Sequence, residues 1–122
     1  MQDGKTARAA VIGLGSMGLG MALSLRRAGF AVAGCDLSAA AVERLVAAGG
    51  TGAATPAEAA AGADIVVSVV VNAAQTESVL FGESGCAAAM PQGAVFVSSA
   101  TMAPEAARAM AERLEATGRH YF

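Results

Sequence analysis

Three glycines stand at a spacing that can hold a phosphorylated ligand. Gly13, Gly15 and Gly18 form the pattern G-x-G-x-x-G directly after a short apolar run. A glycine inside a helix lowers stability by about 0.5–1 kcal/mol relative to alanine. So many glycines at the start of a helix therefore indicate a function that needs them. Binding of a dinucleotide pyrophosphate is such a function, because the pyrophosphate must approach backbone N–H groups at a helix N-terminus. In this interpretation Gly13 permits a tight turn, Gly15 keeps a Cβ away from the phosphates, and Gly18 lets the helix lie close to the sheet.

An acidic residue stands where the same fingerprint expects one. Asp36 closes the apolar segment 30–36, about 20 positions after the glycines. A carboxylate there accepts the ribose hydroxyls of an adenosine and repels a 2′-phosphate. Leu37 and Ser38 follow, with no arginine to receive such a phosphate, so NAD is favoured over NADP. Two alternatives stay open: Asp36 only caps the next helix, or the glycines serve packing alone.

Further polar residues follow two other strand-like segments. Asn72 comes after the segment 64–71, and Ser98, Ser99 and Thr101 come at the end of the segment 94–98 and just beyond it. Ligands of parallel α/β sheets bind at the carboxyl ends of the strands. Asn72 and Thr101 are therefore candidates for cofactor contact, and equally for capping the helices that follow them.

The segments that position these residues alternate between strand and helix patterns. Strands are expected at 8–13, 30–36, 64–71 and 94–98, with a further one beginning at 119–122. Helices follow them, with inward stripes formed by Met17, Met21, Leu25 and Ala28, by Val42, Leu45 and Val46, and by Ala107, Met110, Ala111 and Leu114. Two shorter helices are expected, one started by Thr55, Pro56 and Glu58 and one over about residues 74–80.

This alternation indicates an α/β fold, a doubly wound and mostly parallel sheet of the Rossmann type. The 122 residues suit one dinucleotide-binding domain, residues 1–122. Because the sequence stops where another strand begins, we expect the sheet to be incomplete at its C-terminus.

The composition of the chain argues against several classes of binding partner. The net charge is −2 and aromatic residues make up 4%, so neither a basic stripe nor base-stacking residues suggest nucleic-acid binding. No apolar run approaches the roughly 20 residues of a membrane span, and a secretory signal fits the N-terminus poorly. Cys35 and Cys86 lack metal-ligand spacing and are expected as buried thiols. We therefore expect a cytoplasmic protein without a metal site, a nucleic-acid partner or a membrane partner.

The segment "GLGSMGLGMALSL", residues 13–25, resembles the N-terminal signature of the β-hydroxyacid dehydrogenases, which include 3-hydroxyisobutyrate dehydrogenase. Met17 inside the glycine loop, followed by Met21 and Ala22, makes this likeness more specific than a bare glycine motif. The segments 70–85 and "VSSATMAP" are most similar to the L-threonate dehydrogenase branch. The resemblance covers about residues 7–122.

The resemblance implies NAD as the cofactor and assigns it a set of contacts. These are Gly13, Leu14, Gly15, Ser16, Met17, Gly18, Asp36, Leu37, Val71, Asn72 and Thr101. It implies that Thr101 lies near the nicotinamide and that Ser99 could touch the substrate. The usual Asp-Ser-Ser before that threonine is replaced here by Ser98-Ser99-Ala100, which weakens the assignment of Ser99.

The family's catalytic lysine comes from a helical C-terminal domain that this chain lacks, so no catalytic residue is assigned. Lys5 and His120 match no catalytic position. The resemblance implies hydride transfer between NAD and a small β-hydroxy acid, with L-threonate first, in a longer homo-oligomeric enzyme. We expect the 122 residues alone to be inactive. The alternatives are a non-catalytic, redox-sensing NAD module and an NADP-dependent reductase of the tartronate semialdehyde or imine reductase kind.

Overall fold

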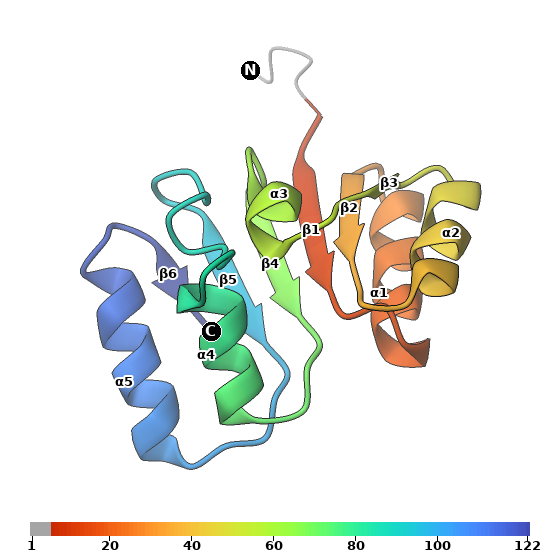
Figure 1. The fold of residues 1–122 in the computed structure, drawn as a ribbon. Coiled ribbons are helices and arrows are strands. Elements are labelled where there is room, and N and C mark those ends of the chain that lie inside the picture. The colour runs from red at the N-terminus through yellow and green to blue at the C-terminus, as the bar shows by residue number, and fades with distance from the viewer. Residues whose placement is uncertain (1–5) are drawn as a thin grey trace.

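A computed structural model describes residues 6–122, so Lys5 lies outside the described part (Figure 1). Six parallel strands form one sheet in the order β3-β2-β1-β4-β5-β6. Their bounds are β1 Arg8–Ile12, β2 Ala31–Cys35, β3 Thr51–Gly52, β4 Ile65–Ser68, β5 Val95–Ser98 and β6 His120–Tyr121. β2 and β3 are added on one side of β1, and the chain then crosses over and adds β4, β5 and β6 on the other side. This is the doubly wound Rossmann order, and the fold expectation is confirmed.

Five helices cover the two faces of the sheet, and two apolar cores result (Figure 1). They are α1 Ser16–Arg27, α2 Ala39–Ala47, α3 Pro56–Ala60, α4 Ala73–Phe81 and α5 Pro104–Glu115. One core joins the sheet to α1 and α2 through Ala22 and Leu45. The other joins it to α3, α4 and α5 and contains Phe96, the largest fully buried side chain among the described residues. In β4, Val66 belongs to one core and Val67 to the other, as expected of a central strand.

Local capping chemistry explains where several helices begin. Thr55 accepts a hydrogen bond from the backbone N–H of Glu58, and Glu58 accepts one from the N–H of Ala54, so α3 starts with the predicted capping pair. Pro56 and Pro104 occupy first-turn positions in α3 and α5, where the missing N–H costs nothing. Within residues 6–122, no helix combines the length and apolar character needed to cross a membrane.

The strands differ from the expectation at two places. The strand expected at 64–71 ends at Ser68, because Ser68 pairs with Ile12 and Ser98 at the points where β1 and β5 also end. Residues 69–71 therefore leave the sheet at its carboxyl edge. The two-residue strand β3, beside Ala33 and Gly34, was not expected, because two residues carry no periodic pattern.

Two of the expected inward stripes are partly wrong. Met17 is 61% exposed and Ala28 is also exposed, whereas Gly18 and Ala22 are buried, because α1 approaches the sheet through its small residues. In α2, Val46 is exposed and Leu45 is buried. In α5 the expected stripe is buried at Met110 and Leu114 and half-buried at Ala107 and Ala111.

Candidate functional site

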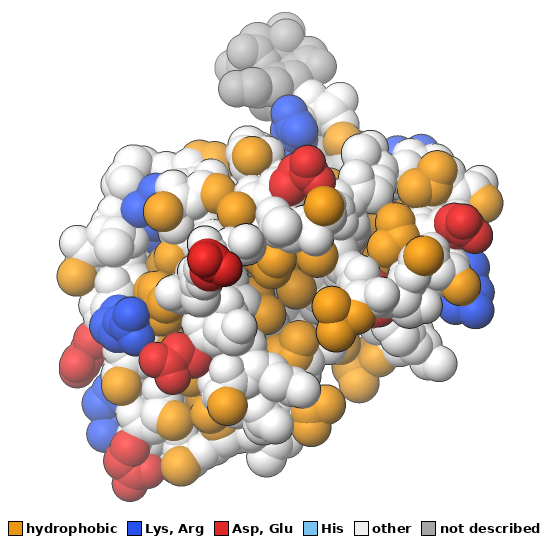
Figure 2. Space-filling view, in the orientation of Figure 1, with side chains coloured by type: hydrophobic (Ala, Val, Ile, Leu, Met, Phe, Trp, Pro, Cys, Tyr) orange, Lys and Arg blue, Asp and Glu red, His pale blue; other side chains and the backbone are white. Residues whose placement is uncertain are grey.

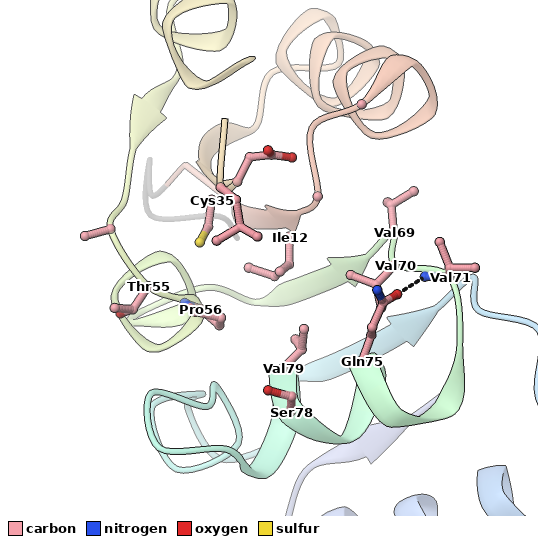
Figure 3. A pocket seen from close by; sticks show the side chains of 15 residues that line it. Ile12, Cys35, Thr55, Pro56, Val69, Val70, Val71, Gln75, Ser78 and Val79 are labelled. Atoms are coloured by element: carbon pink, nitrogen blue, oxygen red, sulfur yellow. Dashed lines mark hydrogen bonds between the residues drawn. The ribbon is translucent and has the colours of Figure 1, made fainter. Parts of the chain in front are cut away.

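The segments that follow four strands, β1, β2, β3 and β4, surround a cleft of about 500 Å³ at the carboxyl edge of the sheet. The loops after β1, β2 and β4 supply one side and the rim, and α3 and α4 supply the remaining walls (Figure 3). Figure 2 shows hydrophobic side chains gathered in a hollow between α3 and α4 on this face. The switch point between β1 and β4 lies here, which is where doubly wound sheets bind ligands.

The glycine motif forms the turn between β1 and α1. Gly13 has a φ of 97°, and a Cβ on it would lie 2.5 Å from the carbonyl oxygen of Val69, so only glycine fits. A Cβ on Gly18 would fall on the carbonyl oxygen of Gly13. Helix α1 therefore packs directly against the loop that precedes it, in addition to the close approach to the sheet expected at the buried Gly18.

Gly15 differs from its two neighbours in the motif. It lines the cleft, and a Cβ on it would meet no protein atom within 4 Å. Its φ of −66° is open to any residue. The fold itself therefore gives no reason for glycine at this position, whereas a ligand that approaches the backbone does.

The N-terminus of α1 is open toward the same cleft. Gly15 is its N-cap, no side chain caps it, and its first turn contains no acidic residue. The first N–H groups of a helix have no intrahelical partner, and with the helix dipole they favour an anion. No lysine or arginine among residues 6–122 lines the cleft, so the positive groups that an anion would meet there are main-chain N–H groups.

Asp36 lies at the carboxyl end of β2 and is bonded to the glycine loop. Its Oδ2 accepts a hydrogen bond from the N–H of Leu14 at 2.6 Å, and its Oδ1 accepts one from the N–H of Ser38 at 2.7 Å. Ser38 caps α2 by accepting from the N–H of Ala41, so the alternative in which Asp36 caps that helix is wrong. Each carboxylate oxygen keeps a lone pair for a ligand hydroxyl.

The candidates after β4 and β5 have different surroundings. Asn72 caps α4, because its Oδ1 accepts from the N–H of Gln75 at 2.9 Å. The hydroxyl of Ser99 donates to the carbonyl oxygen of Ser68 at 3.0 Å, which joins the ends of β5 and β4 and uses its only hydrogen. Thr101 is exposed and does not cap α5, whose N-cap is Ala103, so the capping alternative for Thr101 is wrong.

The two cysteines are buried free thiols, as expected. Cys35 lines the cleft (Figure 3), where burial, Asp36 and Glu58 raise the pKa of its thiol. Burial raises the pKa of Cys86 to about 12. A raised pKa favours the thiol over the thiolate, and the thiolate is the nucleophilic form. Among residues 6–122, no group of three or more His, Cys, Asp or Glu could hold a metal ion.

The sequence patterns did not indicate the far wall of the cleft. It contains Pro56 from α3 and Gln75, Ser78 and Val79 from α4 (Figure 3). The rim carries two exposed apolar side chains, Leu37 at 107% and Val71 at 74% exposure. Met17, at the start of α1, is also exposed. Within residues 6–122, three of the five exposed large apolar side chains thus lie at this edge, which is typical of a ligand site.

Comparison with known proteins finds relatives over nearly the whole chain. The model of the NAD binding domain of 6-phosphogluconate dehydrogenase matches residues 8–122. L-threonate dehydrogenase of Cupriavidus necator is 51% identical over 108 residues, which cover 88% of this chain and 36% of that enzyme. The NAD-dependent L-serine dehydrogenase of Pseudomonas aeruginosa is 37% identical over 99 residues, 81% of this chain and 33% of that enzyme.

Among solved structures, 3-hydroxyisobutyrate dehydrogenase from Salmonella typhimurium is similar in fold, with a TM-score of 0.90 at 38% identity. The likeness covers 94% of this chain and 40% of that one. The chain thus spans less than half the length of each of these relatives.

Proposed function

Since the chain belongs to the family of the NAD binding domain of 6-phosphogluconate dehydrogenase, we propose that its cleft holds NAD at the carboxyl edge of the sheet. The pyrophosphate rests on the turn formed by Gly13, Leu14 and Gly15 and on the first N–H groups of α1, those of Ser16, Met17 and Gly18. Asp36 accepts the hydroxyls of the adenosine ribose.

The observation that carries this proposal is the hydrogen bond between the Asp36 carboxylate and the N–H of Leu14. This bond joins Asp36, the proposed ribose contact, to the turn proposed for the phosphates. It supports the proposal, because a ribose and its 5′-phosphate are also close together. Gly15 supports the same assignment, because the space beside it is open to a ligand.

The apolar rim suits the adenine. Leu37 follows Asp36 directly, and Val71 lies on the loop after β4, so a base attached to the ribose enters between two exposed apolar side chains. Burying such surface against a flat ring is favourable by about 25 cal/mol per Å².

The nicotinamide half lies toward the ends of β4 and β5. Asn72 fixes the start of α4, and Thr101, exposed in the loop after β5, is the candidate contact to the nicotinamide. Ser99 is a poor substrate contact, because its hydroxyl hydrogen is already donated to Ser68. When NAD is bound, its nicotinamide is the group that can accept a hydride, and these residues only position the nicotinamide.

For the whole protein we propose hydride transfer between NAD and a small β-hydroxy acid. L-threonate is the first candidate, since the threonate dehydrogenase of Cupriavidus necator is similar to this chain at 51% identity. In this proposal residues 1–122 form the dinucleotide-binding domain, a helical domain supplies the proton-transferring group, and the enzyme is a cytoplasmic homo-oligomer.

Calorimetric titration with NADH and NADPH tests the cofactor site. We expect NADH to bind and NADPH to bind at least about tenfold more weakly, because the Asp36 carboxylate repels a 2′-phosphate. Asp36→Asn should weaken NADH binding about tenfold or more, since hydrogen bonds to a charged group contribute about 1.5–3 kcal/mol.

Asp64→Asn is the matched control. Asp64 also accepts a backbone N–H, that of Arg8, but it lies just before β4, at the opposite edge of the sheet. It should leave NADH affinity unchanged. Absence of NADH binding to the unsubstituted chain would refute the proposed function, and tighter binding of NADPH would remove the role given to Asp36.

A further inference from the structure

Gln75, which the sequence patterns did not single out, has a fixed side-chain amide at the cleft. Its Oε1 accepts a hydrogen bond from the N–H of Val71 at 2.7 Å, and its own N–H donates to Asn72 at 2.9 Å. The start of α4 thus resembles a capping box, except that the Gln75 side chain bonds the residue before the N-cap, Val71, instead of the N-cap Asn72 itself. The bond to Val71 holds the Gln75 side chain in one orientation.

This pairing also determines which end of the amide faces the ligand. Because Oε1 is bonded to Val71, the –NH₂ group is the end left for the cleft (Figure 3). A flipped amide would set an N–H group against the N–H of Val71. Nε2 makes no hydrogen bond to another side chain or backbone group within residues 6–122, so its hydrogens are available to a ligand.

The surroundings of this donor are mostly apolar. Ile12, Val69 and Val79 line the cleft near it, and Leu37 and Val71 form the rim. The other polar side chains of the lining are those of Cys35, Asp36, Thr55 and Ser78. The thiol is a weak donor and the carboxylate only accepts, so the hydroxyls of Thr55 and Ser78 are the other hydrogen-bond donors of the cleft wall. Once a flat ring displaces water from such a cleft, the amide needs an acceptor on that ring.

We propose that Gln75 recognises the base of the cofactor by donating from Nε2 to the unprotonated N1 of adenine. This inference rests on the proposed NAD site. Asp36, on the opposite wall, would hold the ribose that is attached at N9 of the purine. The far edge of the base, which carries N1, is then directed toward α4 and Gln75. Hypoxanthine carries a hydrogen on N1 and cannot accept there, so Gln75 favours adenine.

The test compares NAD with nicotinamide hypoxanthine dinucleotide by calorimetric titration of the 122-residue chain. We expect the unsubstituted chain to prefer NAD by about 3- to 10-fold, the usual effect of one hydrogen bond. Gln75→Glu keeps an acceptor for the N–H of Val71, removes the donor and adds a negative charge. It should weaken NAD binding by a similar factor and abolish or reverse the preference for adenine.

Ala74→Glu is the matched control for the added negative charge. Ala74 is exposed in the same first turn of α4 but does not line this cleft. It should keep the ratio of the two affinities found in the unsubstituted chain. Both variants should unfold at the temperature of the unsubstituted chain, because neither loses a hydrogen bond of the fold.

The outcomes separate the two proposals. If the unsubstituted chain binds neither dinucleotide, the NAD site itself is wrong, and this inference is wrong with it. If it binds NAD but shows no preference, or if Gln75→Glu and Ala74→Glu give the same ratio of affinities, Gln75 is only a helix cap and the inference alone is overturned.

Discussion

At the scale of single residues, the three glycines of the motif serve three different purposes. Gly13 adopts a positive φ beside the carbonyl oxygen of Val69, and Gly18 permits contact between α1 and the carbonyl oxygen of Gly13. Gly15 has no steric neighbour in the protein. The fold therefore explains two of these glycines, and the proposed ligand would explain the third.

This difference predicts opposite effects of alanine at two positions of the motif. Gly15→Ala should leave the free energy of unfolding within about 0.5 kcal/mol and weaken NADH binding about tenfold or more, since a misplaced methyl costs about 1–3 kcal/mol. Gly18→Ala should destabilise the fold by about 1–3 kcal/mol or more. Urea unfolding and calorimetric titration measure the two effects separately.

Gly20→Ala is the control for adding a methyl group to α1. Gly20 is exposed and a Cβ on it meets nothing, but it lies outside the cleft. It should stabilise the helix by about 1 kcal/mol and leave NADH affinity unchanged. Equal NADH affinity of Gly15→Ala and Gly20→Ala would show that no pyrophosphate rests against Gly15.

At the scale of elements, the start of α4 connects stability to the site. Asn72 caps the helix, and Gln75 in the same turn holds the N–H of Val71 on the rim. The side chain of Thr76 adds a hydrogen bond to the carbonyl oxygen of Asn72 at 2.9 Å. The loop after β4, which was expected to be strand, is thus ordered by helix capping rather than by sheet pairing.

Substitutions of Asn72 test this role of the cap. Asn72→Ala should lower the free energy of unfolding by about 0.5–2 kcal/mol, because an N–H at the helix start loses its acceptor. Asn72→Asp should retain stability, since aspartate caps as well as asparagine. Thermal unfolding compares the three chains. Equal losses in both variants would mean that the Asn72 side chain stabilises the fold through something other than capping.

At the scale of the whole molecule, the parallel order of the strands brings the separate ligand candidates to one edge. The loops after β1, β2 and β4 meet there, and α3 and α4, which cover the same face of the sheet, supply further walls of the cleft. His120 is exposed at the start of β6, at the other end of the strand from this edge. The described residues bring no acid–base pair to the cleft.

The 122-residue chain should therefore bind NAD without turning over a hydroxy acid. At 100 times the dissociation constant, NADH should stabilise the fold by about 2.7 kcal/mol through mass action, seen as a rise in the unfolding temperature. Mixing the chain with NAD and L-threonate should give no NADH absorbance. Formation of NADH would contradict the assignment of the proton-transferring group to another domain.

Much of this site could be predicted from local sequence patterns. The turn chemistry of Gly13, the capping pair at Thr55 and Glu58, and the alternation of strands and helices depend on residues close together in the chain. The spacing from the glycine motif to Asp36 is fixed by the length of one helix and one strand. For these reasons the sequence by itself determined the Rossmann class and the positions proposed for phosphate and ribose.

Only the tertiary structure decided where strands end and which side chains face the ligand. β4 stops at Ser68 because its neighbours stop there, and Met17 is exposed because Gly18 and Ala22 face the sheet. Gln75 enters the cleft because the crossover sets α4 opposite the end of β2. Such placements depend on pairing between distant segments, and hydrophobic periodicity within one segment contains no information about its partners.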